Sequence, residues 1–349
     1  MKVLVTGADG YIGAVLGPYL AEHGHRVSGL DSGFYRNGWL YEDGKRRPPP
    51  ARLDIRQVDA ADVVDFDAVV HLAELSNDPL GEHDPQLTYA INHRGSVDLA
   101  RTCQAAGVRR FVYTSSCSVY GAGSDAPRTE ESEVRPQTAY ARCKMLVERD
   151  VQALADERFT PVFLRNATAY GASPRMRFDI VLNNLAGHAW TGGEIKMTSD
   201  GTPWRPLVHV EDISEAILLA LEAPREHVHN QIFNVGSDEQ NYRIREIAEI
   251  VAAAFPGCVL TYGPPSGDTR SYRVSFAKIR RHLPGFRCSW TAERGARQLR
   301  EIFERIAMTK EMFGYRAFTR LQQLKYLVAT RQIDGEFYFR EPAERAAEA

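Results

Sequence analysis

The chain has 349 residues and a formal net charge of −2 at pH 7, with 43 basic and 45 acidic residues. This length can bury a large core, and the balanced charge gives no electrostatic footprint for nucleic acid or an anionic membrane. No apolar run approaches the length of a membrane span, and a strand starts at once, so we expect neither a membrane anchor nor a signal peptide. The five cysteines lack metal-binding spacing, which indicates reduced thiols, no metal site and a cytoplasmic protein.

Residues 2–6 form an apolar, partly β-branched run that predicts a buried strand. Gly7, Gly10 and Gly13 follow at intervals of three, and an amphipathic stretch then runs from Ala14 to His23. A strand that passes through tight glycines into a helix directs backbone N–H groups and the positive helix end toward one point. The pattern therefore predicts a pyrophosphate-binding turn of a dinucleotide site.

A second apolar run, residues 26–30, ends in Asp31. A carboxylate at this point can accept hydrogen bonds from an adenosine ribose. No arginine is adjacent to Asp31, so a 2′-phosphate would meet repulsion and NAD is favoured over NADP. Arg36 is near enough in sequence to leave NADP as the alternative.

Strands and helices alternate over the next hundred residues. The pattern predicts strands near Leu53–Val58, Ala68–Ala73, Arg110–Ser115 and Pro161–Leu164, and helices at about Pro85–Ala106 and Thr138–Leu154. Such alternation indicates an α/β fold, a Rossmann-type doubly wound parallel sheet covered on both faces. We assign residues 1–172 to this NAD-binding domain.

The alternation changes after Gly171. Residues 173–205 hold one helix, at about Phe178–Trp190, and start a smaller substrate-binding lobe. The strand Leu207–Val210, the helix Glu211–Leu221 and the strand Gln231–Val235 are expected to return to the main sheet, so that about 206–240 belongs with the first domain. Residues 241–349 complete the lobe with a helix at Ile244–Phe255, a strand at Val259–Tyr262 and a C-terminal helical extension. We expect that extension, including Leu299–Ile306 and Phe318–Leu327, on the outside of the lobe.

Tyr140 and Lys144 lie four residues apart on a predicted helix and therefore share one face. An ammonium beside a phenol favours the phenolate, and so does the positive nicotinamide of an oxidised cofactor. Such a phenolate could take a proton from a sugar hydroxyl while hydride leaves the same carbon. The serine-rich block Thr114–Gly121 ends a predicted strand, where open α/β sheets bind ligands, and could supply a hydroxyl to the same substrate oxygen. Glu74 follows a strand of this sheet and either faces the sugar or is an exposed loop carboxylate.

The ordered set of motifs resembles the extended short-chain dehydrogenase/reductase family, the NAD-dependent nucleotide-sugar epimerases and dehydratases. The resemblance covers about residues 1–290 and rests on the glycine motif, Asp31, His71-Leu72-Ala73, Asn92-x-x-Gly95, the serine block, Tyr140-x-x-x-Lys144, and Arg205 with Val208-His209-Val210-x-Asp212.

The resemblance implies a role for individual residues. Tyr140 is the acid/base, Lys144 holds the nicotinamide ribose and tunes Tyr140, Ser116 is the hydroxyl partner, and Asn92 helps to order the central helices. The cofactor would be tightly bound NAD, held by Gly7, Gly10, Tyr11, Ile12, Gly13, Asp31, Asp59, Ala60, Leu72, Ala73, Thr114, Tyr140 and Lys144. The diphosphate of a nucleotide sugar would meet Asn184, Arg205 and Arg270, with Thr168 at a position where the family often has asparagine, and Ser116 would contact the sugar.

Departures from the family pattern narrow the expected reaction. Dehydratases carry an acidic pair after the catalytic hydroxyl, where this chain has Cys117 and Ser118, so a 4,6-dehydratase is disfavoured. Some 3,5-epimerising members have a cysteine base at the position of Ser118, which keeps Cys117 and Ser118 as candidate catalytic residues. Because adjacent residues at a strand end face different ways, a packed Cys117 is favoured.

The favoured function is therefore an NAD-dependent nucleotide-sugar 4-epimerase. The alternatives are a 4-ketoreductase, a 3,5-epimerase or another keto-sugar tailoring enzyme, then a 4,6-dehydratase, and last a non-catalytic dinucleotide-sensing regulator. Helices 85–106 and 138–154 resemble those of a four-helix dimer contact in this family, which implies a homodimer.

Overall fold

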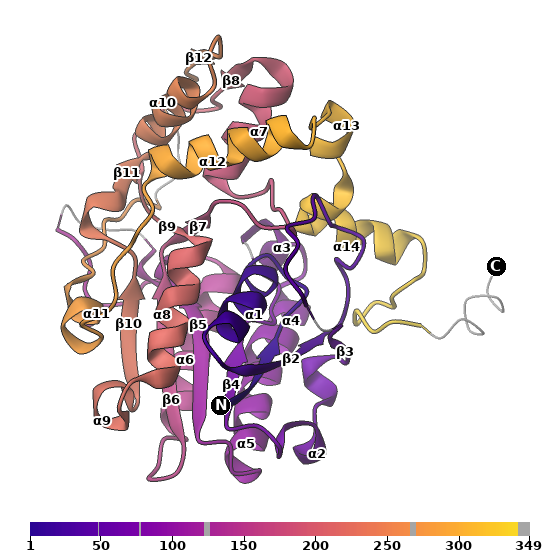
Figure 1. Cartoon of the computed structure of the whole chain (residues 1–349), viewed down its shortest axis with the longest axis vertical. Helices are drawn as coiled ribbons and strands as arrows, with labels where there is room; N and C mark the ends of the chain where they lie inside the picture. The colour runs from indigo at the N-terminus through magenta and orange to yellow at the C-terminus, as the bar shows by residue number, and fades with distance from the viewer. Residues whose placement is uncertain (48, 77, 122–125, 266–269, 341–349) are drawn as a thin grey trace.

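The computed structural model describes residues 1–47, 49–76, 78–121, 126–265 and 270–340 (Figure 1). Its centre is a seven-stranded sheet in the order β10-β6-β5-β4-β1-β2-β3, and every neighbouring pair is parallel. This order confirms the predicted Rossmann-type fold. The strands are β1 (Lys2–Thr6), β2 (Arg26–Asp31), β3 (Ala51–Arg52), β4 (Ala68–His71), β5 (Arg110–Ser116), β6 (Thr160–Asn166) and β10 (Gln231–Val235).

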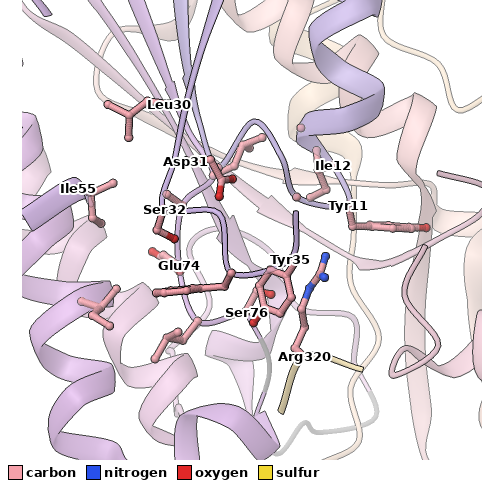
Figure 2. A pocket seen from close by; sticks show the side chains of 18 of the residues that line it. Tyr11, Ile12, Leu30, Asp31, Ser32, Tyr35, Ile55, Glu74, Ser76 and Arg320 are labelled. Carbon is pink, nitrogen blue, oxygen red and sulfur yellow. The ribbon is translucent and has the colours of Figure 1, made fainter. Parts of the chain in front are cut away.

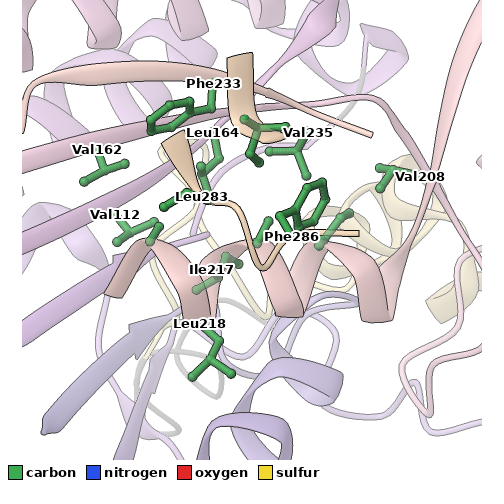
Figure 3. Close-up of a cluster of buried hydrophobic side chains, with 14 of the residues drawn as sticks. Val112, Val162, Leu164, Val208, Ile217, Leu218, Phe233, Val235, Leu283 and Phe286 are labelled. Carbon is green, nitrogen blue, oxygen red and sulfur yellow. The ribbon is translucent and has the colours of Figure 1, made fainter. Parts of the chain in front are cut away.

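Helices cover both faces of this sheet because successive strand residues point to opposite sides. Val3 and Val5 of β1 pack into one hydrophobic cluster, which also takes the apolar sides of α1 (Gly13–Glu22) and α8 (Val210–Glu222). Figure 3 shows strand residues of this cluster beside Ile217 of α8. Leu4 points the other way, into a cluster with α2 (Ala60–Val63), α5 (Ser96–Ala105) and α6 (Ala139–Gln152).

A smaller lobe lies above the sheet in Figure 1. Its core packs α7 (Val181–Gly192), α10 (Ile244–Ala254) and α12 (Ala292–Arg305) together, with Leu299 and Phe303 of α12 fully buried. The parallel pair β8 (Glu194–Lys196) and β12 (Val259–Thr261) lies beside them. The division of the chain into an NAD-binding domain and this lobe, at the residues given above, remains a prediction.

One predicted strand belongs to a different sheet. β10 and α8 do return to the main sheet, as expected. The strand at Leu207–Val210, observed as β9 (Trp204–His209), instead pairs with β7 (Thr168–Tyr170) and β11 (Asn241–Arg243) in a separate three-stranded sheet. The prediction was wrong because a short buried apolar run fits either sheet equally well.

The C-terminal extension also departs from the prediction. α12 lies within the lobe core, but α14 (Arg320–Ala329) does not pack on the outside of the lobe. Leu324 and Leu327 of α14 are buried in the same cluster as Leu30 and Ile55, which belong to the sheet side of the molecule. Residues 266–269 and 341–349 of the predicted lobe and extension lie outside the described residues.

Two predicted elements have a different local form. Residues 53–58 hold a 3₁₀ turn, η1 (Ile55–Gln57), rather than a strand. The predicted helix at 85–106 is α4 (Pro85–Thr88), a π-helical segment η2 (Tyr89–Gly95) and then α5. The remaining short elements are α3 (Asp78–His83), η3 (Cys117–Tyr120), α9 (Arg225–Val228), η4 (Asp238–Gln240), α11 (Ala277–His282), α13 (Lys310–Phe313) and η5 (Arg316–Phe318). Within the described ranges, no helix combines the length and apolar character needed to cross a membrane.

Candidate active site: two cavities joined by a tyrosine–lysine helix

The turn between β1 and α1 requires glycine for two different reasons. Gly7 has φ +72°, and a Cβ there would lie 2.9 Å from the backbone nitrogen of Ala73. At Gly13 a Cβ would lie 2.4 Å from the carbonyl oxygen of Gly7. The left-handed conformation and the close approach together keep side chains out of the turn. What remains is a backbone cradle of the kind that accommodates a pyrophosphate.

A cavity opens at the carboxyl ends of β1, β2 and β4 (Figure 2). Its wall includes eight of the residues predicted to bind the cofactor: Gly7, Gly10, Tyr11, Ile12, Gly13, Asp31, Leu72 and Ala73. Ligands of doubly wound sheets bind at this edge. Two arginines from distant segments, Arg177 and Arg320, also line the cavity, and the sequence pattern gave no signal for either.

Asp31 is the last residue of β2 and lines the cavity. Its carboxylate accepts hydrogen bonds from the backbone N–H of Gly33 at 2.7 Å and of Asp9 at 3.0 Å. Burial raises the pKa of Asp31, while those two backbone donors oppose the rise. The side chain is thus held at the end of β2, the position at which a ribose would meet it.

Asp59 and Ala60 are not among the residues that line this cavity, and their role as cofactor contacts remains a prediction. Both are exposed, and the Asp59 carboxylate caps α2 by accepting from the backbone N–H of Ala61 and Asp62. Asp54 and Ile55, in the preceding turn, line the cavity instead.

Tyr140 and Lys144 project from the first turns of α6, where Thr138 caps the helix by accepting from the N–H of Ala141. The Lys144 ammonium lies 5.5 Å from the centre of the Tyr140 ring, and Ser116, at the end of β5, is near enough to lower the pKa of the Tyr140 phenol. The structure therefore brings the three predicted catalytic residues together. Thr114 takes part through its carbonyl oxygen, which accepts from the Lys144 ammonium at 2.5 Å.

The sequence left the role of Glu74 open. In the structure its side chain is buried and has two polar partners, Lys144 and Tyr113. Its side chain is 2% exposed, and its carboxylate lies 2.6 Å from the Lys144 ammonium. It also accepts a 2.6 Å hydrogen bond from the Tyr113 hydroxyl. Burial alone would lower the pKa of Lys144, but Glu74, Tyr140 and Glu148 together offset that effect and raise it.

The phenol of Tyr140 titrates differently from the expectation. Burial raises its pKa, the Lys144 ammonium lowers it as predicted, and the carboxylates of Glu74 and Asp78 raise it. The net direction for the protein groups alone is upward. The sequence could not show this, because Glu74 reaches the site only through the packing of β4 against β5 and α6.

A second, smaller cavity lies near the start of α6. Thr138 and Ala141, which flank Tyr140 on α6, line it together with Ser118, Arg205 and Arg270. Arg270 forms a 2.7 Å ion pair with Asp78, whose other oxygen accepts from Thr138. Glu74, the ion-pair partner of Lys144, lines the first cavity, and Thr138 and Ala141, close to Tyr140 in sequence, line the second.

The serine block places its two central residues differently. Cys117 is 1% exposed, donates to the carbonyl oxygen of Arg165 at 3.2 Å and packs in the hydrophobic core, and burial raises the pKa of its thiol. Ser118 faces the second cavity, and its hydroxyl is buried with no hydrogen-bond partner in the described part of the chain.

Two predicted substrate contacts lie away from both cavity walls. Asn184 donates its amide to the carbonyl oxygen of Phe178 at 2.8 Å, and Thr168 begins β7 opposite Leu207. Their substrate roles remain predictions. Across the described residues, no group of three or more His, Cys, Asp or Glu side chains is arranged to hold a metal ion.

Asn92 lies in the π-helical segment and fixes the loop after β4. Its amide oxygen accepts from the N–H of Leu75 at 2.8 Å, and its amide nitrogen donates to the carbonyl oxygen of the same residue at 2.9 Å. Leu75 and Ser76 line the first cavity. π-helical segments occur often at functional sites, and this one holds part of the cavity wall.

Fold and site together define an enzyme of the extended short-chain dehydrogenase/reductase type. The family model for the NAD dependent epimerase/dehydratase family matches residues 3–236, and the chain belongs to that family. The predicted family and its NAD cofactor are thereby confirmed.

Characterised relatives and solved structures agree with this assignment. The chain is 28% identical over 315 residues to UDP-glucose 4-epimerase of Corynebacterium glutamicum, covering 84% of this chain and 91% of that protein. It is 30% identical over 307 residues to UDP-glucose 4-epimerase of Mycolicibacterium smegmatis, covering 81% and 92%. The structure of MoeE5 in complex with UDP-glucuronic acid and NAD aligns with a TM-score of 0.76 at 27% identity, over 87% of this chain and 99% of that one.

Proposed function

We propose that this protein is an NAD-dependent nucleotide-sugar 4-epimerase. The observation that carries the proposal is the cluster of Tyr140, Ser116 and Lys144, whose neighbours Glu74 and Thr138 line the two cavities. NAD fits the larger cavity because the backbone turn at Gly10 can receive its diphosphate and the carboxylate of Asp31 can receive its ribose. When bound, NAD supplies a reversible hydride acceptor. The relatives named UDP-glucose 4-epimerase support the same reaction.

The chain's own residues would handle the proton of the reaction. Ser116 and Tyr140 hydrogen-bond to the hydroxyl at carbon 4, and Tyr140 takes its proton as the hydride leaves that carbon. The keto-sugar then turns over in the smaller cavity. Tyr140 returns the proton to the same oxygen when the hydride comes back to the opposite face, so the reaction is redox-neutral. Such positioned acid/base catalysis contributes about 10²- to 10⁴-fold in rate.

The smaller cavity suits a nucleotide diphosphate sugar. Arg205 and Arg270 offer cationic groups for a diphosphate, and the unpartnered hydroxyl of Ser118 faces the same space. The position after Ser116 argues against water elimination, since Cys117 is packed in the core and no acidic pair follows the serine. An epimerase needs neither an acid nor a base there.

The test is to incubate the purified enzyme with a panel of nucleotide sugars without added cofactor and to read the products by NMR. Inversion at carbon 4 is the expected result. Loss of water would identify a dehydratase, and turnover that requires stoichiometric NADH or NADPH would identify a ketoreductase. Inversion at carbons 3 and 5 of a keto-sugar would identify the 3,5-epimerase. Binding of NAD with no turnover of any sugar would indicate a regulator.

Assembly and location follow from the family resemblance. We propose a homodimer through α5 and α6, which would bring two helices from each protomer together, and a cytoplasmic location. Light scattering during gel filtration measures the mass; a mass of 39 kDa, that of one chain, would contradict the dimer.

A further inference from the structure

Two arginines outside the predicted site line the dinucleotide cavity. Arg177 lies between β7 and α7, and Arg320 is the first residue of α14. Both are buried, at 7% and 3% exposure, and both contribute to the wall that also holds Gly10, Tyr11 and Ile12. Figure 2 shows Arg320 beside Tyr35 and Ser76, across the cavity from Ile12.

The guanidinium of Arg177 is only partly satisfied. Its Nε donates to a carboxylate oxygen of Asp179 at 2.8 Å, and its Nη1 donates to Ser76 at 3.1 Å. Its Nη2 is buried and has no hydrogen-bond acceptor among the described residues. An unpaired donor in such a place costs about 1–3 kcal/mol, and more when it is charged.

The guanidinium of Arg320 has still fewer partners. It lies over the ring of Tyr35 at 3.9 Å, but it makes no hydrogen bond or ion pair within the described ranges. The hydrogen bond that joins Arg320 to Asp179 comes from the backbone N–H of Arg320, at 3.1 Å. Burial and the neighbouring charge of Arg177 lower the pKa of Arg320 to about 10, which leaves it protonated at neutral pH.

The cavity therefore carries guanidinium donors that the carboxylates of its own wall do not satisfy, and Asp54 of the wall is ion-paired with Arg56. Asp179 is ion-paired with Arg177, while Glu74 is ion-paired with Lys144. Asp31 uses both oxygens on backbone N–H groups. Buried cations of this kind are tolerated when an anion completes the site.

We propose that Arg177 and Arg320 hold the diphosphate of the dinucleotide from the side opposite the glycine turn. A diphosphate carries two negative charges, and the planar donor fork of arginine suits phosphate oxygens. The ligand belongs to the cofactor rather than the sugar nucleotide because both arginines line the cavity of Gly10 and Asp31. The cavity of Ser118, Arg205 and Arg270 is separate. Arg320 also lies beyond residues 3–236, so the family match does not account for it.

The test compares Arg320→Met and Arg177→Met with Lys325→Met, which removes an exposed cation from the same helix as Arg320. Protein freed of nucleotide is titrated calorimetrically with NAD⁺, ADP, adenosine and UDP. Loss of a charge-assisted hydrogen bond should weaken NAD⁺ and ADP by about 10- to 100-fold in each arginine variant. Adenosine and UDP should bind as in the parent, and Lys325→Met should bind all four as the parent does.

Thermal unfolding without nucleotide separates this role from a purely structural one. Replacing the Arg320 guanidinium, which has no ion-pair partner among the described residues, by an apolar side chain of similar size should leave the melting temperature of Arg320→Met unchanged or raise it. Arg177→Met leaves Asp179 without its ion-pair partner and should lower the melting temperature, so the thermal control applies to Arg320→Met. A lower melting temperature with unchanged NAD⁺ and ADP affinity would overturn the proposal. Weakened UDP with unchanged NAD⁺ would also overturn it and would assign the arginines to the sugar nucleotide. These readouts need no turnover, so they hold whether or not the protein epimerises a sugar.

Discussion

Glu74 places a negative charge 2.6 Å from Lys144 and within the cluster that holds Tyr140. Its carboxylate raises the pKa of Lys144 against the effect of burial, and it adds to the burial that raises the pKa of Tyr140. The groups titrate together, so an activity profile reports the cluster rather than one residue. In this site the acid/base pair is tuned by a third, acidic residue.

Glu74→Gln should move the whole pH profile of kcat toward acid. Removing the negative charge lowers the pKa of Tyr140, so the base form appears at lower pH, and it lowers the pKa of Lys144, so the ammonium is lost at lower pH. Both limbs therefore shift in the same direction. The measurement is kcat from pH 5 to 10, with Glu74→Asp as the control that keeps the charge; a profile unchanged in Glu74→Gln would contradict this account.

Tyr140→Phe should lower kcat by about 10²- to 10⁴-fold, the usual contribution of a positioned acid/base group. The phenol ring and its packing stay, so NAD⁺ binding should not change. Steady-state kinetics and calorimetry check the two parts. Activity close to that of the parent would show that another group moves the proton.

At the scale of elements, the π-helical segment η2 and the loop after β4 form one unit. Asn92 satisfies both backbone polar groups of Leu75, and the loop carries Leu75 and Ser76 into the cavity wall. A π turn inserts one extra residue into a helix. The geometry of the helix is therefore coupled to the geometry of the cofactor site.

Asn92→Ala should destabilise the protein by about 2–4 kcal/mol, since it leaves a buried N–H and a buried C=O without partners. It should also speed NAD⁺ release, because the loop is no longer held. Urea unfolding and stopped-flow displacement measure the two effects. Asp98→Ala, at an exposed position on α5, is the matched control, and equal release rates in both variants would refute the coupling.

At the scale of the whole molecule, two buried histidines make stability depend on pH. Burial lowers the pKa of His71, with a further contribution from Lys144, and burial also lowers the pKa of His209, each to about 3. Their unfolded pKa is near 6.5. Between these values the unfolded chain binds more protons than the folded one, so stability falls as the pH falls below 6.5.

Each histidine should contribute a slope of about 1.4 kcal/mol per pH unit between pH 6 and 4. Urea unfolding at intervals of half a pH unit measures the slope. His209→Gln should reduce the slope by that amount, because glutamine takes up no proton in this range and can keep a hydrogen bond to Gln298. An unaltered slope in this variant would show that His209 is charged in the folded protein.

Sequence periodicity located six of the seven strands of the main sheet, because these are apolar runs separated by helices, but it missed β3, whose two residues are exposed. The glycine turn and the Tyr140–Lys144 pair were accessible too, since each is a local spacing. Glu74, Arg177 and Arg320 were not, because their roles depend on burial by segments far away in sequence. Asp54 and Ile55 also carried no sequence signal, because only packing brings them to the cavity.

The docking of α14 beside the sheet has a consequence for biosynthesis. A ribosome delivers residues 2–235, and with them all seven strands, well before residues 320–329 emerge. A nascent chain can thus form the glycine turn early. Its dinucleotide site is complete only after α14, with Arg320, has been synthesised. Tight binding of the cofactor and folding of the complete chain would then be reached together.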